Sequence, residues 1–332
     1  MLAIAIDKKG DMEKPMKTAV YEAQVAIERE EAARSYRKNQ IASLVGLPLV
    51  TGIGHLAPSV GAARAMLGYW YFDWPILIAT STITAFIDGY DKYRDIPKAE
   101  RPSALATACW LIPLLGSTLV ASYAAGLDTS VRLHRWLLYG FVYGNPLIPY
   151  YSFKTKALRL AKPKVVLSWL KSASIALVMA NVDADIGATH ACMVMDGAHC
   201  PRWDLEADGS AVGTADTYWR SFAVAFLYNW VRETMCDVRD LDEDTEEGVP
   251  TLPVAFGKNG TLALILFVTV VAEQVFMGSG LLRPMPLDSV LRVAVTFVGC
   301  VLIKDRPRED TFAWGLIALI GLCPATWAQA RL

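Results

Sequence analysis

The sequence predicts an all-α, polytopic membrane bundle of about nine transmembrane helices, and three observations lead to this fold class. The 332 residues are 54% hydrophobic and only 20% charged, which is more apolar than an average soluble domain. Long apolar runs alternate with short charged clusters, as in a chain that crosses a bilayer repeatedly. Basic residues gather in alternate loops, which is the charge asymmetry of polytopic membrane proteins.

Nine apolar runs are candidate spans, because about 20 residues cross the hydrocarbon core of a bilayer. Backbone groups in hydrocarbon must bond within the chain, so each run is expected to be a helix. These helices form one transmembrane domain at 39–332, preceded by a charged cytosolic or interfacial arm at 1–38. The expected spans are 40–60, 67–88, 103–126, 135–153, 165–187, 215–236, 260–281, 288–303 and 312–329.

Charge sets the expected orientation and partners. The loops that follow the even-numbered spans hold most of the basic loop residues, which predicts that these loops face the cytosol. The net charge of −1 provides no field that would attract nucleic acid. The protein is therefore expected to reside in the lipid bilayer and not to bind nucleic acid.

Two short segments repeat one spacing of aspartates, and they carry the clearest chemical signal. They follow the second and sixth spans, so they fall on the same side of the membrane. On a helix, offsets of 0, 3 and 7 place three carboxylates on one stripe. The two DxxDxxxD motifs are Asp88, Asp91 and Asp95, and Asp237, Asp240 and Asp244.

Each stripe is unfavourable without a counter-charge, because like charges three and four residues apart repel. The C-terminal end of a helix also disfavours anions. Mg²⁺ would remove both costs, since it binds a few carboxylates together with phosphate oxygens. We therefore expect all six aspartates to act as catalytic metal ligands that hold one diphosphate and weaken its C–O bond. The competing interpretation is a pair of solvated acidic loops, which the repeated spacing disfavours.

A longer run around the second motif resembles the UbiA superfamily of intramembrane prenyltransferases. This run comprises Tyr228, Asn229, Arg232-Glu233, the three aspartates, Thr251-Leu252-Pro253-Val254 and Gly257. Further similar segments are Arg101-Pro102, Tyr151-Ser152, and the basic residues Lys154, Lys156 and Arg159. By helix order the likeness covers residues 40–329. One departure is Ile87, which stands where family members often have asparagine.

The resemblance implies an enzyme of terpene biosynthesis and secondary metabolism that ionises a prenyl diphosphate with Mg²⁺. The prenyl group would then pass to an acceptor, which is an aromatic ring in many relatives. Ile87 keeps open a membrane terpene synthase, in which a substrate such as farnesyl diphosphate cyclises without an acceptor. A non-catalytic prenyl-lipid-binding protein also remains open, whereas a transporter would place its charges nearer the midplane.

Cations and polar side chains complete the expected site. A diphosphate needs cations at its leaving oxygens, although cytosolic loops are basic in any case. The candidate diphosphate-binding residues are Lys92, Arg94, Lys154, Arg159, Arg232 and Arg239, with Lys156 as a further cation. Polar side chains within a span cost free energy in the membrane, so a functional role is the first interpretation. Hydrogen bonding and packing between helices also explain them. The candidate substrate-pocket residues are Tyr143, Asn145, Tyr150, Tyr151 and Asn229, with Glu233 and Lys171 nearby.

The remaining histidines and cysteines suggest no metal centre. The loop at 189–214 contains His190, Cys192, His199 and Cys200, whose spacing matches no standard zinc site. A Cys192–Cys200 disulfide or two free thiols are the alternatives there. His55 lies in the first span and is expected to be a packed core histidine.

Overall fold

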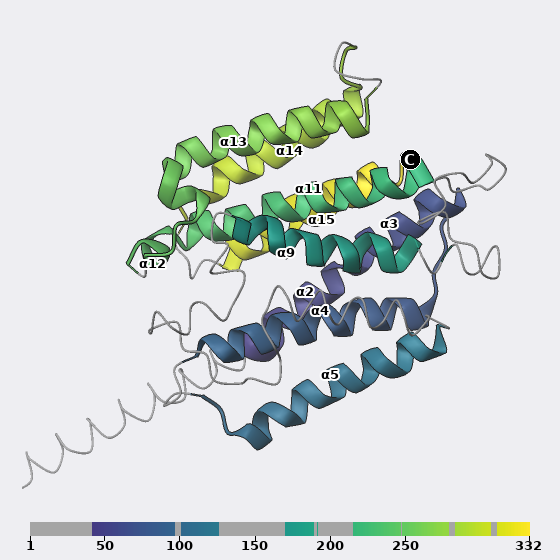
Figure 1. Cartoon of the computed structure of the whole chain (residues 1–332), viewed down its shortest axis with the longest axis vertical. Coiled ribbons are helices and arrows are strands. Elements are labelled where there is room, and N and C mark those ends of the chain that lie inside the picture. Colours follow the sequence, from purple (N-terminus) through teal and green to yellow (C-terminus); the bar gives the residue numbers. More distant parts are fainter. Residues whose placement is uncertain are drawn as a thin grey trace, which may run out of the picture. The chain divides into compact units, whose positions relative to one another are not determined.

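Helices make up all the regular structure in the described part of the chain (Figure 1). The computed structural model describes residues 42–96, 101–125, 170–188, 191, 215–246, 248–278, 283–306 and 311–332. Residues 48–332 form one compact unit and residues 1–47 another. The division falls after Leu47, so η1 (Ala42–Gly46) belongs to the first unit and α2 (Leu47–Gly54) begins at the division. The predicted arm at 1–38 lies outside the described residues.

The first helices pack through small residues that permit close backbone approach. α2 is followed, after His55, by α3 (Leu56–Leu67), and the chain then turns into α4 (Trp74–Asp95). A Cβ on Gly52 would lie 2.3 Å from the carbonyl oxygen of Ser81, so only glycine allows α2 to pass α4 at this point. α4 packs along α5 (Ala104–Ala124), and the hydroxyls of Thr82 and Thr118 are 2.8 Å apart between these two helices.

α9 (Lys171–Ala180) continues into a π-helical turn, η4 (Asn181–Asp185). The sequence placed one uninterrupted span here. π-helical turns are rare and are frequent at functional sites, and this one contains the buried Asp183. α9 and η4 share an apolar cluster with α4, in which Ile87 packs with residues such as Val178 and Val182. Ile87, the residue that departs from the family pattern, is therefore part of the apolar core.

α11 (Ala215–Arg239) is the central packing helix of the described unit. It contacts α9, α13 (Leu252–Phe276) and α15 (Thr311–Gln329) most extensively (Figure 1). Its buried side chains, among them Val231 and Met235, form one apolar cluster with Ile265 of α13 and Ile317 of α15. α12 (Leu241–Glu246) follows α11 directly. Because α11 carries the second aspartate motif at its end, this packing positions that motif.

The C-terminal helices α13, α14 (Leu287–Ile303) and α15 pack in sequence order. α13 begins eight residues before the expected span, because Thr251 precedes it as the N-cap residue and a proline occupies the first turn. Gly257 then kinks the helix, with φ 67° and ψ 169°, a backbone region that is essentially restricted to glycine. The Thr-Leu-Pro-Val and glycine pattern of the sequence therefore specifies a short helical turn and a sharp bend.

The described helices agree with membrane insertion. Among the described residues, four segments are long and apolar enough to cross a membrane: Leu44–Leu67, Ala104–Ala124, Leu252–Phe276 and Phe312–Gln329. Large apolar side chains such as Leu105, Val120 and Leu287 are more than two-thirds exposed, as expected of side chains that face lipid. The described parts of the expected spans are largely helical, although 40–60 is divided among η1, α2 and α3, and 135–153 lies outside the described residues. The described part of the chain is all-α and carries helices that suit a membrane, and the count of nine spans stays a prediction.

Candidate active site

The first aspartate motif lies within α4 rather than in a loop after it. Asp88 is partly buried, and Lys92 one turn later donates to its carboxylate at 3.0 Å. Asp91, Arg94 and Asp95 follow on the same helix, and their side chains lie outside the described part of the structure. α4 extends seven residues past the expected end of the span, so its helical backbone carries the whole predicted stripe.

The second motif continues from α11 into α12 with only a local break. Asp237 is in the last turn of α11, Asp240 is in the break, and Asp244 is on α12. The amide of Asp240 still bonds the carbonyl of Cys236 at 3.0 Å, and that of Asp244 bonds the carbonyl of Asp240 at 2.9 Å. The four-residue repeat of these bonds keeps Asp237 and Asp244 on one face, as the spacing predicted.

The carboxylates of Asp237 and Asp244 converge on the ammonium group of Lys171. The distances from Lys171 Nζ are 2.7 Å to Asp237 Oδ1 and 3.7 Å to Asp244 Oδ1. The second oxygen of Asp237 accepts from the hydroxyl of Ser172 at 2.6 Å, and that of Asp244 accepts from the hydroxyl of Thr251 at 3.1 Å. Each carboxylate therefore has one oxygen fixed by a hydroxyl and the other directed at a shared cation.

Burial affects the protonation of Asp244, which lies on α12 outside the apolar helices. Loss of hydration raises the pKa of Asp244 to about 6, although the nearby ammonium of Lys171 opposes the rise. Asp237 adds to the rise because two neighbouring carboxylates repel each other. A further cation at this position would favour the ionised form of both carboxylates.

Trp314 of α15 brings the two motifs together. Arg239 of α11 lies over its indole ring, with 3.6 Å between Cζ and the ring centroid. Lys92 of α4 lies 5.5 Å from the same centroid. Arg239 also holds the carboxylate of Asp240 through two bonds of 2.9 and 3.0 Å. One cation from each motif therefore contacts a single aromatic ring, which places Asp88 and Asp240 at the same end of the bundle.

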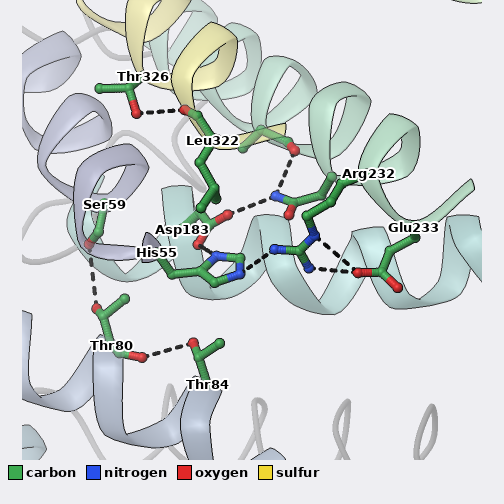
Figure 2. Close-up of polar contacts among 11 residues, drawn as sticks. His55, Ser59, Thr80, Thr84, Asp183, Arg232, Glu233, Leu322 and Thr326 are labelled. Carbon is green, nitrogen blue, oxygen red and sulfur yellow. Dashed lines mark hydrogen bonds and ion pairs between the residues drawn. The ribbon is translucent and has the colours of Figure 1, made fainter. Parts of the chain in front are cut away.

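A second polar cluster lies deeper among the helices (Figure 2). His55, between α2 and α3, bonds through Nδ1 to the carboxylate of Asp183 and through Nε2 to the guanidinium of Arg232. Arginine only donates, so Nε2 of His55 accepts the bond from Arg232. His55 and Asp183 are fully buried. The sequence correctly predicted a buried histidine, but its ionic partners were not foreseen.

Arg232 and Asn229 extend this buried cluster along α11. Arg232 donates to Oε1 of Glu233 from Nε at 3.1 Å and from Nη2 at 2.7 Å. Asn229 donates to Asp183 at 2.7 Å. A Cβ on Gly321 would lie 2.9 Å from the Cβ of Arg232, so α15 leaves room for this arginine. The predicted cation Arg232 is thus bonded to His55 and Glu233, and its binding of a diphosphate stays a prediction.

Several predicted site residues lie outside the described part of the chain. They include the basic residues Lys154, Lys156 and Arg159, the pocket residues Tyr143, Asn145, Tyr150 and Tyr151, and the loop residues His190, Cys192, His199 and Cys200. Conversely, sequence reasoning missed Asp183 and Trp314. An aspartate within the apolar run 165–187 was a usable signal, because charges inside spans are rare. Trp314 gave no such signal, since tryptophan is common near span ends.

The donor set at the second motif fits a divalent cation. No group of three possible metal-binding side chains occurs among the described residues, a set that excludes the side chains of Asp91 and Asp95. Nevertheless, Asp237 and Asp244 direct one oxygen each at a common cation position. Hard divalent cations prefer such oxygen ligands, and Mg²⁺ typically uses only one or two carboxylates with substrate phosphate oxygens.

Curated relatives match part of the chain. A digeranylgeranylglyceryl phosphate synthase of Methanococcus aeolicus is 36% identical over 113 residues, which cover 30% of this chain and 38% of that protein. The protein of the same name from Thermococcus kodakarensis is 30% identical over 92 residues, which cover 26% and 32%. The match thus spans about a third of the length of these relatives.

Two solved structures and one family model are also similar. The apo structure of a UbiA homolog from Aeropyrum pernix K1 has a TM-score of 0.45 at 15% identity, covering 85% of this chain and 96% of that one. A digeranylgeranylglyceryl phosphate synthase structure has a TM-score of 0.43 at 17% identity, covering 90% and 100%. The family model described as VviA prenyltransferase matches residues 38–332. Because this match takes in nearly the whole chain, the protein belongs to the VviA prenyltransferase family.

Proposed function

We propose that this prenyltransferase uses Mg²⁺ at its two aspartate motifs to ionise a prenyl diphosphate and pass the prenyl group to an acceptor. The observation that carries the proposal is the contact of Lys92 and Arg239 with the ring of Trp314. Because both cations contact this ring, the ion pair of the first motif lies near the ion pair of the second motif. A single diphosphate is the ligand that suits two such groups at one end of a helical bundle.

Each described residue has a separate role in this proposal. Mg²⁺, when bound, neutralises the diphosphate and so favours its departure from the prenyl carbon. Ser172 and Thr251 orient the carboxylates of Asp237 and Asp244 through their hydroxyls. Lys92 and Arg239 donate to the departing oxygens. Preorganised charges of this kind stabilise the transition state because they need no rearrangement as the bond breaks.

The acceptor is the finer part of the proposal. The resemblance implied an aromatic ring, whereas the relatives from M. aeolicus and T. kodakarensis are named for a glyceryl phosphate product. An aromatic ring and the hydroxyl group of a glyceryl phosphate are both nucleophiles that can attack an allylic cation. The family model is described as a prenyltransferase, which favours transfer over the acceptor-free cyclisation. We further propose that the motif end of the bundle faces the cytosol, as the basic loops predict.

Product analysis tests this function. Membranes that contain the protein would be incubated with Mg²⁺ and C10, C15 or C20 prenyl diphosphates, with an aromatic acceptor, with a prenylglyceryl phosphate, or with neither. The expected result is release of pyrophosphate and an acceptor-bound prenyl product only when Mg²⁺ and one acceptor class are present. A cyclic hydrocarbon or cyclic terpene alcohol formed without acceptor would instead establish cyclisation. Turnover that persists in excess chelator would overturn the metal-dependent mechanism.

Trp314 should govern substrate affinity in this reaction. Replacing Trp314 with alanine is expected to raise the KM for the prenyl diphosphate roughly tenfold and to change kcat much less, because the cation–π contacts position both cations. Trp314→Phe should recover most of the affinity, since it retains an aromatic face. Steady-state kinetics of the purified protein measure both constants. Trp219→Ala, at the far end of α11, is the control, and an equal rise in KM there would refute the specific role.

A further inference from the structure

A lysine side chain occupies the cation position of the second motif. Lys171 lies in the first turn of α9, and its ammonium is 2.7 Å from Asp237 Oδ1 and 3.7 Å from Asp244 Oδ1. Its side chain is 19% exposed, and those of the two aspartates are 4% and 10% exposed. The ammonium is therefore largely enclosed with two carboxylates, where water screens the charges weakly.

The hydroxyl contacts show that this arrangement resembles a cation site more than a surface ion pair. Ser172 and Thr251 bind the outer oxygens of Asp237 and Asp244, at 2.6 and 3.1 Å. Both inner oxygens are left to the same cation. Two buried carboxylates this close repel each other unless a positive charge lies between them. Lys171 supplies that charge from a separate helix.

The other described motif aspartates also have cations of this chain as partners. Asp88 is bound by Lys92 at 3.0 Å, and Asp240 is bound by Arg239 at 2.9 Å. In each of these pairs the two residues are close in sequence, and the cations Lys92 and Arg239 also contact Trp314. Lys171 differs because it joins two aspartates of the motif and comes from α9.

From this geometry we infer that Lys171 is a built-in cation that competes with the divalent ion for the Asp237–Asp244 pair. The inference rests on the proposed function, in which these aspartates bind the metal. A metal ion between the two inner oxygens would lie against the ammonium, and like charges in a poorly screened site exclude each other. The ammonium must therefore leave the pair when the metal binds. Its flexible four-carbon stem permits that movement, and a bound diphosphate would offer the ammonium a new anionic partner.

The competition predicts tighter metal binding when the lysine charge is removed. Lys171→Met retains the length and apolar stem of the side chain. Its affinity for Mn²⁺ in the absence of substrate is expected to be at least about tenfold higher than that of the wild type, which is the usual size of a neighbouring like-charge effect. Electron paramagnetic resonance of free Mn²⁺, with protein purified in detergent, measures this affinity directly and does not depend on turnover.

Two controls and one further measurement make the outcome decisive. Lys258→Met removes a partly buried lysine of α13 and should leave Mn²⁺ affinity unchanged. Combining Lys171→Met with Asp237→Asn should abolish the gain. Mg²⁺ should raise the thermal unfolding temperature of Lys171→Met more than that of the wild type, because the metal replaces the missing charge.

Unchanged or weaker Mn²⁺ binding by Lys171→Met would refute the competition, as would a variant that stays unfolded in both the presence and absence of Mg²⁺. The proposed function fails by a different result, namely the absence of metal-dependent product formation by the wild type. A wild-type enzyme that turns over with Mg²⁺, alongside a Lys171→Met variant of unchanged affinity, would reject only the role of Lys171.

Discussion

Replacing Asp240 with alanine is expected to lower the rate of prenyl transfer by at least about 100-fold, the usual cost of removing one group that stabilises transition-state charge. Asp240 lies between Asp237 and Asp244 and holds Arg239, whose guanidinium stacks on Trp314. The substitution therefore removes a proposed metal ligand and releases a proposed diphosphate-binding cation together. Product formation from a prenyl diphosphate and Mg²⁺ measures the loss. Asp91→Ala should have a similar effect through the first motif.

The matched control for this loss is Asp216→Ala. Asp216 lies in the first turn of α11, is 69% exposed and pairs with Arg220 four residues later. Its removal should change the rate less than about twofold, because exposed pairs contribute little. Normal turnover by Asp240→Ala, in protein that unfolds at the wild-type temperature, would leave the second motif without a catalytic role.

The largest stability effect is expected at a buried ion pair between α13 and α14. Arg292 donates to both oxygens of Glu273, at 2.9 and 2.7 Å, and both side chains are fully buried. Tyr228 of α11 bonds the same carboxylate. Glu273→Met is expected to cost about 3–5 kcal/mol of unfolding free energy, because it leaves the guanidinium without its main counter-charge. Thermal unfolding in detergent measures the change.

A double substitution separates the cost of an unpaired charge from the value of the pair itself. Glu273→Met combined with Arg292→Met removes both charges and should be closer to the wild type in stability than Glu273→Met alone. Asp288, the other partner of Arg292, is 27% exposed and can be hydrated instead. If the double variant were less stable than both single variants, the pair would contribute net stability, contrary to this expectation.

The sequence by itself determined the fold class, the motifs and the family. A long apolar run predicts a helix in a membrane, because the backbone N–H and C=O groups of an open strand would have no hydrogen-bond partners in hydrocarbon. The DxxDxxxD spacing fixes a shared helical face, and the convergence of Asp237 and Asp244 on Lys171 agrees with it. The Thr-Leu-Pro-Val and glycine pattern also determined a local structure, the start and the kink of α13, since proline and a positive-φ glycine restrict the backbone. These properties depend on residues that are close in sequence.

Only the tertiary structure decided which distant side chains meet. Nothing near Asp183 in the sequence indicates His55, which is 128 residues away, or Arg232 on a third element. Trp314 joins Lys92 and Arg239 across more than 200 residues of chain, and Lys171 reaches the second motif only because α9 packs along α11. Such contacts follow from helix packing, which depends on the fit of whole helical surfaces and not on any local spacing. For this reason the spacing of the aspartates was predictable from the sequence, whereas the contacts of Lys171 with the second motif, and of Lys92 and Arg239 with Trp314, were found only in the folded chain.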